Sequence, residues 1–434
     1  MSMRLIPVTL LFFIVSCTAS VSNRYDVSDF GAVKDGTTLD TDAIQQAIDK
    51  AAAKGGGTVY FSPGTYLTGT IQLKSNVSLQ FESGAKLLGS ENLTDYTGEK
   101  KSLIVGEDLQ NIKISGKGII DGNGETFWDD DFKALPRPEP WILLKNCTNL
   151  SISEVKFMNS PSHTIRLESS QDVVFDDISI VNDFRGPNTD GIDIVDSQNI
   201  HVSNSYISTG DDAICLKTRQ QAVENVIVTN CMLESDDAAI KFGTGSRVAT
   251  RFCVFSDITI RKTRYGIAMF MLDGGIYEHN QFSNITIETD SRHKHEYPIY
   301  IDIDKRTDER SYGQVFNNSF NDIKIVSDGK VLISGHPESY IESLDLNNLS
   351  FHLKEDQDFS NAKKPRGNKK YPKLGTSDDL SRENGVFVLG YTNRAVLNDL
   401  TVTKDTELVT QRRAIIPIEV KELDNTDFRN LLDQ

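Results

Sequence analysis

Cysteine, proline and tryptophan are scarce in this chain of 434 residues, which has 5, 12 and 2 of them. So few cysteines over such a length exclude a disulfide framework, and no spacing of cysteine and histidine indicates a structural zinc site. Cys215 and Cys231 each lie inside a strand-like run, which favours small buried side chains. We therefore expect no disulfide scaffold, no bound metal and no cofactor.

An excess of basic residues is also missing, because 46 lysines and arginines face 62 acidic residues and the formal net charge is −16. Binding to nucleic acid requires a concentrated basic face, so we exclude a nucleic-acid partner. An acidic polysaccharide is not excluded, since a few local lysines and arginines are enough to hold one. The 30 glycines and the low proline count favour many short strands joined by tight turns.

A long apolar run is the third missing feature. The longest candidate follows Arg4, spans residues 5–15, and falls short of the roughly 20 residues that a membrane-spanning helix needs. It ends in Ile-Val-Ser-Cys17, a pattern that resembles a bacterial lipobox. We expect residues 1–16 to be a lipoprotein signal peptide, Cys17 to carry the lipid, and residues 17–24 to form a tether.

An ordinary secretory peptide cut near Ala19 is the alternative. Both interpretations predict an exported protein. With the lipid, it would be periplasmic or at the cell surface and would touch the membrane only through its N-terminal anchor. We expect residues 25–434 to form one catalytic domain and the protein to be a monomer.

A repeating unit dominates the rest of the chain: a polar anchor followed by alternating apolar residues, as in Asp177-Ile-Ser-Ile. Alternation with period two is typical of β-strands, and such anchors tolerate the unusual backbone angles of turns. Successive anchors lie 23, 27, 26, 27, 27, 38 and 26 residues apart, and Asp399 follows 51 residues later, close to two periods. The eight anchors before it are Glu154, Asp177, Asn204, Asn230, Asp257, Asn284, Asp322 and Asn348.

A short all-strand unit cannot bury a core alone and must stack on its neighbours as a solenoid. Leucine-rich repeats have a similar length, but their consensus is absent. We predict an all-β fold, a right-handed single-stranded parallel β-helix. Residues 41–54 are Ala-rich with Ile44 and Ile48 on one face, which predicts a helix that caps the N-terminal end. Residues 354–382 are polar, interrupt the period, and predict an inserted loop.

Three motifs follow one another along the repeat: Asn159-Ser-Pro, Asn188-Thr-Asp-Gly-Ile-Asp and Thr209-Gly-Asp-Asp-Ala-Ile-Cys-Leu-Lys. They come after an N-terminal region, from Tyr25-Asp-Val to Gly55-Gly-Gly-Thr-Val-Tyr-Phe, that is similar to the start of pectin-degrading β-helix enzymes. Together the motifs resemble the polygalacturonase family, glycoside hydrolase family 28, over nearly the whole mature chain. The resemblance implies a hydrolase that cleaves a pectic or related acidic or branched polysaccharide or oligosaccharide.

Three aspartates in these motifs have the spacing of a catalytic centre. Asp190 and Asp212 are 22 residues apart, close to one coil, so we expect them on adjacent rungs about 4.8 Å apart. Asp211 follows the turn-prone Gly210, which lets it reach the same cleft. Like charges packed together raise at least one carboxyl pKa, and glycoside hydrolysis requires a protonated acid beside an ionised one. A calcium cage or a ladder of aspartates at turns is the alternative.

The resemblance also implies roles for these residues. Asp211 would be the general acid, and Asp190 with Asp212 would position and deprotonate the attacking water. The family inverts the anomeric configuration, which is consistent with a base that works through water.

Two elements of the family pattern are missing here. The Gly-His-Gly expected one coil after the Gly-Asp-Asp is replaced by Glu234-Ser-Asp-Asp, so we expect the carboxylate of Asp237 in place of the imidazole. The Arg-Ile-Lys that holds a galacturonate carboxylate is replaced by a run with Ala268 and Phe270 at the cation positions. The loss of both cations predicts little activity on homogalacturonan. Phe270 would instead offer an apolar surface for a neutral sugar such as rhamnose or galactose.

Five other side chains are candidates for substrate binding. His163 lies 27 residues before Asp190, as a cleft wall or a simple turn residue. Lys217 and Lys241 follow the acidic pairs and would hold substrate acids or, in the preferred interpretation, compensate the aspartates. The remaining two, Arg185 and Arg247, belong to loops beside the cleft or to the solvated surface. Asp273 has the pattern of a turn residue.

Two other functions compete with hydrolysis. A polysaccharide lyase on the same fold would need a basic residue, and usually calcium, to remove the C5 proton, whereas this centre contains only carboxylates. A non-catalytic glycan-binding β-helix would have no need for three clustered aspartates.

Overall fold

The nine polar anchors of the repeat all adopt the left-handed backbone conformation, with φ between 51° and 63°. Asn and Asp reach this region more readily than other non-glycine residues, because their short side chains bond locally. Anchors of successive coils also bond to one another. Asn230 Nδ2 donates to Asn204 Oδ1 at 2.7 Å, and Asn284 Nδ2 donates to Asp257 Oδ1 at 2.6 Å. The same turn chemistry therefore closes each coil.

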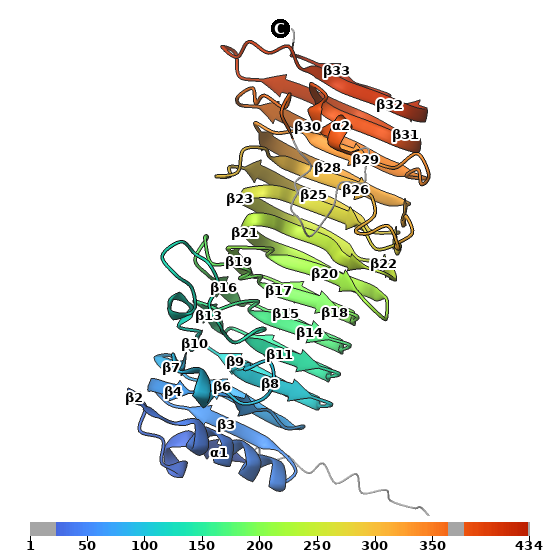
Figure 1. The fold of residues 1–434 in the computed structure, drawn as a ribbon. Coiled ribbons are helices and arrows are strands. Elements are labelled where there is room, and N and C mark those ends of the chain that lie inside the picture. The colour runs from blue at the N-terminus through green and yellow to red at the C-terminus, as the bar shows by residue number, and fades with distance from the viewer. Residues whose placement is uncertain (1–22, 363–376, 433–434) are drawn as a thin grey trace, which may run out of the picture.

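The computed structural model describes residues 23–362 and 377–432, and it shows these coils stacked along one axis (Figure 1). All ladders between the named strands are parallel, as in the pairing of Ile192 with Ile214. The prediction of a right-handed parallel β-helix is confirmed. Its interior is made of stacked apolar side chains, of which one row is fully buried: Ile165, Ile192, Ile214, Ile240, Ile267 and Ile299. Each such side chain contributes roughly 1.5–3 kcal/mol by burial.

The strands form three columns along the axis. The first column, which carries the candidate site, contains β5 (Ile71–Gln72), β8 (Ile104–Glu107), β11 (Ile142–Lys145), β14 (Ile165–Glu168), β17 (Ile192–Val195), β20 (Ile214–Thr218), β26 (Tyr297–Ile303) and β29 (Val331–Ser334). The second contains β1 (Arg24–Asp26), β3 (Gly57–Phe61), β6 (Val77–Phe81), β9 (Gln110–Gly116), β12 (Thr148–Ser153), β15 (Gln171–Asp176), β18 (Gln198–Ser203), β25 (Gln281–Thr289), β28 (Asn318–Ser327) and β30 (Leu344–Leu353). The third contains β2 (Asp35–Leu39), β4 (Gly64–Thr68), β7 (Ala85–Gly89), β10 (Ile119–Asp121), β13 (Lys156–Met158), β16 (Ser179–Val181) and β19 (Tyr206–Thr209).

Other strands bend between columns or extend a coil at its edge. The bending strands are β21 (Val223–Ser246), β23 (Val254–Met271), β31 (Gly385–Lys404) and β32 (Arg413–Asp424), and the edge strands are β22 (Ala249–Arg251), β24 (Ile276–Glu278), β27 (Gln314–Phe316) and β33 (Arg429–Asn430). Short 3-10 turns occupy Val27–Phe30, Leu93–Asp95 and Gly124–Phe127.

Helix α1 (Thr41–Ala53) covers the N-terminal end of the stack (Figure 1). Its apolar face, which includes Ile44 and Ile48, is fully buried. The helix protects inward-facing side chains of the first coil from water, as a solenoid end requires. The predicted capping helix is confirmed, and it ends one residue earlier than expected.

The spacing of 51 residues before Asp399 does not represent two coils. Asn347 in β30 pairs directly with Asn398 in β31. The anchors that follow them, Asn348 and Asp399, therefore lie on neighbouring coils, and an insertion lies between β30 and β31. The insertion includes helix α2 (Ser377–Arg382). The interpretation of two periods was wrong because an insertion of about one coil length mimics a second repeat.

Several expectations concern residues outside the described ranges. The predicted signal peptide and Cys17 lie there, as does most of the predicted tether. Within residues 23–362 and 377–432, no helix is long and apolar enough to span a membrane. The four cysteines in these ranges are free and buried, so the prediction for Cys215 and Cys231 is confirmed.

Candidate active site

The outer face of the first column changes character along the axis. Strand register aligns one row of outward side chains across successive coils, in the order Arg166, Asp193, Cys215, Lys241, Ala268, Tyr300, Leu332. The coils up to Lys241 present charged residues, and those from Tyr265 onward present aromatic and aliphatic ones. We call these parts the charged segment (Arg166, Asp190, Asp193, Asp212, Lys217, Lys241) and the apolar segment (Tyr265, Ala268, Phe270, Tyr297, Tyr300, Leu332).

The charged segment contains a cavity of about 350 Å³ that is lined mainly by ionisable side chains. Oxygens of Asp211, Asp212 and Asp237 lie within 4.8 Å of one another. Strand pairing offsets these coils by 26 residues, with Thr209 opposite Ser235, so Asp237 lies beside Asp211. The cavity brings together seven of the residues singled out in the sequence: His163, Asp190, Asp211, Asp212, Lys217, Asp237 and Lys241.

The carboxyl groups of Asp211 and Asp212 are hard to ionise in this cavity. Burial, together with the negative charges of Asp190 and Asp212, raises the pKa of Asp211 well above its usual value. Burial also raises the pKa of Asp212 to about 7, although the neighbouring Lys241 opposes that rise. Like charges at short range have the same effect in other carboxylate centres. Asp211 therefore retains a proton that it can donate.

Lys241 joins two of the carboxylates. Its ammonium donates to Asp212 Oδ1 at 2.8 Å and to Asp237 Oδ2 at 3.0 Å, and Lys241 itself is buried. Arg264 Nη1 approaches Asp237 Oδ1 at 3.8 Å. These contacts agree with the interpretation of Lys241 as a compensating charge, because the amine faces two carboxylates of the protein.

Asp193, which the sequence analysis did not single out, is a fully buried carboxylate beside the cavity. It accepts hydrogen bonds from Lys217 Nζ at 2.6 Å and from Arg166 Nη2 at 2.9 Å. Burial alone would raise its pKa, but the charges of Lys217 and Arg166 hold that pKa below its usual value. Lys217 also lies 3.4 Å from Asp190, so the same cation holds both carboxylates in place.

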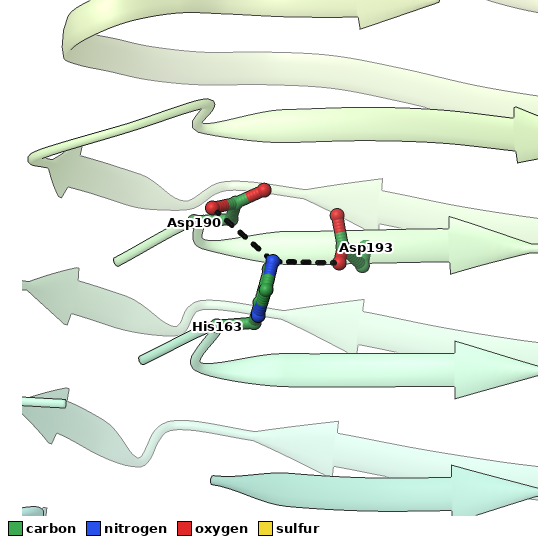
Figure 2. Close-up of side chains that lie close together, drawn as sticks. All are labelled: His163, Asp190 and Asp193. Atoms are coloured by element: carbon green, nitrogen blue, oxygen red, sulfur yellow. Dashed lines mark ion pairs between the residues drawn. The ribbon is translucent and has the colours of Figure 1, made fainter. Parts of the chain in front are cut away.

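His163 lies one coil before these carboxylates and points toward both (Figure 2). Its Nε2 is 3.7 Å from Asp190 Oδ1 and 3.9 Å from Asp193 Oδ2. Burial lowers the pKa of His163, so the imidazole is neutral near neutral pH. His163 therefore forms a wall of the cavity, and the alternative of a simple turn residue is wrong.

The carboxyl group of Asp211 is oriented by residues outside the three aspartates. Asn188 Nδ2 donates to Asp211 Oδ2 at 3.1 Å. Arg137 is 4% exposed at its side chain and donates to the carbonyl of Pro161 at 2.9 Å and to Asn188 Oδ1 at 3.5 Å. Asn188 begins the Asn-Thr-Asp-Gly-Ile-Asp motif. No pattern in the sequence indicates Arg137, which reaches the site from a loop 51 residues earlier.

A second cavity, of about 520 Å³, opens beside the first and shares His163, Asn188, Lys217 and Thr244 with it. Five cationic side chains line it, against two acidic ones: Arg166, Lys217, Arg219, Arg247 and Arg306. We call it the cationic cavity.

Asp273 fixes Arg306 in the cationic cavity. Two bonds join the guanidinium to its carboxylate, at 2.6 and 2.8 Å, and the backbone N–H of Gly245 donates to it at 3.0 Å. The interpretation of Asp273 as only a turn residue was wrong, because a residue more than one coil later supplies its partner.

Two of the expected substrate-binding residues are not at the site. Phe270 is 1% exposed and packs against Tyr265 and Tyr300, so it offers no surface to a sugar. Arg185 is exposed, lies 3.9 Å over the ring of Phe132, and is not among the described residues that line the two cavities. The expectation for Phe270 failed because outward-facing positions of a β-helix are normally solvated, and here they are covered.

Two groups of side chains have the ligand types of a metal site: His163 with Asp190 and Asp193, and Asp211 with Asp212 and Asp237. In each group a lysine ammonium lies within 3.0 Å of a carboxylate oxygen. The protein itself therefore supplies positive charge to both groups.

Comparison with known families places this geometry in context. The family model described as glycosyl hydrolases family 28 matches residues 59–327, which include all the aspartates of the cavity. The chain belongs to this family. It is 34% identical over 212 residues to a polygalacturonase of Persea americana, covering 47% of this chain and 45% of the relative. It is 29% identical over 328 residues to polygalacturonase-2 of Solanum lycopersicum, covering 71% and 70%.

Solved structures support the same fold. A family 28 exopolygalacturonase of Yersinia enterocolitica aligns with a TM-score of 0.71 at 21% identity, covering 93% of this chain and 78% of that one. An exopolygalacturonase of Thermotoga maritima aligns with a TM-score of 0.67 at 21% identity, covering 76% and 87%. A surface adhesin of Streptococcus pneumoniae shares the fold too, with a TM-score of 0.56, 18% identity and coverage of 94% and 92%. The chain spans about half the length of the first curated relatives, 45% for the proteins of Vitis vinifera and Persea americana.

Proposed function

We propose that the protein is an inverting glycoside hydrolase that cleaves a pectic polysaccharide containing uronate units. The observation that carries the proposal is the half-buried Asp211 in the acidic cavity, whose raised pKa keeps it protonated beside Asp190 and Asp212. A glycan-binding β-helix or an adhesin gains nothing from burying such a group, because it costs folding free energy at neutral pH.

The reaction is a single displacement. Asp211 gives its proton to the glycosidic oxygen as the bond from that oxygen to the anomeric carbon breaks. Asp190 and Asp212 hold a water on the opposite side and accept its proton as the water oxygen bonds to the anomeric carbon. Lys217 and Lys241 keep these carboxylates in place, and Lys241 favours the ionised form of Asp212.

The cationic cavity supports an acidic sugar next to the cleaved bond. The expectation of a neutral sugar depended on missing cations and on an exposed Phe270, but Phe270 is buried. The cations of this cavity lie outside the run that replaces the Arg-Ile-Lys of the family motif. Two of these cations, Arg247 and Arg306, follow Lys217 in the sequence. A planar guanidinium binds a carboxylate through two parallel hydrogen bonds, which suits a uronate.

Reducing-end release from polygalacturonic acid and from rhamnogalacturonan, measured at equal concentration, tests the proposal. We expect cleavage of at least one, with no product absorbing in the ultraviolet. An unsaturated, absorbing product would identify a lyase and overturn the hydrolase.

A variant pair tests the acidic sugar. Loss of a charge-assisted hydrogen bond of about 1.5–3 kcal/mol predicts that Arg247→Gln raises KM for the acidic substrate by about one to two decades. Arg185→Gln is the matched control, because Arg185 is exposed and lies outside both cavities. Equal KM values for the two variants would show that Arg247 and the cationic cavity do not bind the substrate.

We also propose that the protein is an exported lipoprotein tethered through Cys17, supported by the short apolar run that ends at this cysteine. Fractionation of cells expressing Cys17→Ser tests this. The variant should leave the membrane fraction, and a variant that remains there like the parent would contradict the tether.

A further inference from the structure

The boundary between the two outer-face segments falls next to the catalytic carboxylates. Lys241 belongs to the charged segment, and its partner on the next coil is Ala268, which is fully buried. The ring of Phe270 lies 5.5 Å from the Lys241 ammonium. The outer face therefore changes from the ionisable side chains of the cavity to apolar ones within one coil.

The apolar segment is covered by other parts of the chain. Its members are all at most 1% exposed, and they pack with Phe359, Ala362 and Leu380 from the insertion that follows β30. These covering residues lie far from the site in sequence and occupy the outer face of the coils that follow it. Substrate cannot lie on that part of the face, because protein atoms fill it.

The cover is held by specific contacts at Phe359. The ring stacks on His295 with centroids 5.0 Å apart, and the Lys330 ammonium lies 3.8 Å from its centre. Lys330 also donates to the carbonyl of Ser381 at 2.9 Å. Buried Arg412 fixes the neighbouring backbone by donating to the carbonyl of Gly385 at 2.8 Å. These buried cations tie the insertion to the column of strands.

The charged segment therefore has one closed end. It spans four coils, from Arg166 to Lys241, and three intervals of about 4.8 Å give roughly 14 Å along the axis. Toward the N-terminus the same outer row continues with Leu143 and Val105, which are half-buried rather than covered. A glycan lying along the axis has room for only a few units before it meets the apolar wall.

We propose that the site takes the end of a uronate chain, not its interior, so that the enzyme releases short products from one terminus. This inference rests on the proposed hydrolase function. The closed end, the short charged segment and the anchored cover carry it together.

Viscosity and reducing ends, followed together on polygalacturonic acid with the parent protein, provide the first test. We expect reducing ends to accumulate while viscosity stays nearly constant, with one short product size from the earliest time. A rapid fall in viscosity and a ladder of intermediate sizes would overturn chain-end action and leave the hydrolase proposal standing.

Binding to the inactive Asp211→Asn variant provides a second test that does not depend on turnover. Oligogalacturonides of increasing length should bind more tightly until they fill the charged segment, after which affinity should stop rising. Blocking one terminus should weaken binding at least tenfold, and blocking the other should not. Affinity that keeps rising with length, or equal binding of both blocked forms, would overturn the inference. Failure of every oligogalacturonide to bind would instead reject the proposed uronate substrate, and the chain-end inference with it.

Discussion

The charged and apolar segments lie on the same face of the same strand column, share its strand register, and differ only in the side chains that point outward. In the charged segment, buried ions such as Asp193 are paired with lysine and arginine. In the apolar segment, the corresponding positions hold residues such as Tyr300 that are covered by an insertion. The inward side chains of both segments form the same stacked core, so the outward side chains can differ from coil to coil. One strand column therefore carries a polar site next to a buried apolar surface.

The comparison also separates two ways of burying an outward residue. Ions are buried among counter-ions around a cavity, where a substrate can reach them. Aromatic rings are buried beneath another part of the chain, which makes them structural.

The largest effect is expected for Asp211→Asn, which removes the proposed proton donor beside the charged segment. Turnover should fall by about 10²–10⁴-fold, while substrate binding is retained. The folded-state pKa of Asp211 is raised, so its carboxyl group lowers stability as pH rises from its unfolded pKa toward that folded value. The variant should therefore melt no lower than the parent at neutral pH. Turnover above about a tenth of the parent's would require another acid.

Asp193→Ala should destabilise the fold by about 3–5 kcal/mol, because it leaves two buried cations without their shared carboxylate. Urea unfolding at neutral pH measures this. Asp405→Ala is the matched control, since Asp405 pairs with His352 at 2.9 Å but is 60% exposed at its side chain. A change for Asp193→Ala as small as that of the control would mean that the buried network is not needed for folding.

Ala268→Arg places a cation at the position where the family motif has one. We expect a loss of stability of about 3 kcal/mol and no gain on polygalacturonic acid, because the position is buried among apolar groups. Thermal unfolding and KM for that substrate are the measurements. A stable variant with a lower KM would show that the apolar segment opens to substrate, contrary to the structure.

The smallest effects are shifts of the pH profile. Asp212 has a pKa of about 7, and the rate should rise with pH as it ionises. Lys241→Met removes a charge that favours ionisation, so the acidic limb should move to higher pH by about one unit. Asp237→Asn removes a charge that opposes ionisation, so the limb should move to lower pH. Shifts in the same direction for both variants would exclude Asp212 as the group that sets this limb.

Much of the fold follows from local patterns in the sequence. The left-handed anchors, the alternating strands and the capping helix each depend on residues close together in the chain. The aspartates of the cavity could be predicted for a related reason, since Asp190 and Asp211 lie in two short motifs on successive coils.

The roles of residues whose partners are distant in the sequence could not be predicted from local patterns. From the sequence, Phe270 resembles an exposed platform, but Phe359 from the insertion that follows β30 covers its segment. Arg137 reaches Asn188 from a loop two coils earlier, and Arg306 reaches Asp273 from a later loop. Such contacts are set by how coils stack and loops fold over them, and no short-range pattern encodes them.

The central claim is that Asp211 donates a proton while Asp190 and Asp212 activate water in a single displacement. Proton NMR of the first product formed from a defined oligogalacturonide tests it most directly, because the anomeric signal appears before mutarotation. We predict that the first product has the anomeric configuration opposite to that of the substrate bond. A first product with the retained configuration would require a covalent intermediate and would contradict the roles of all three aspartates.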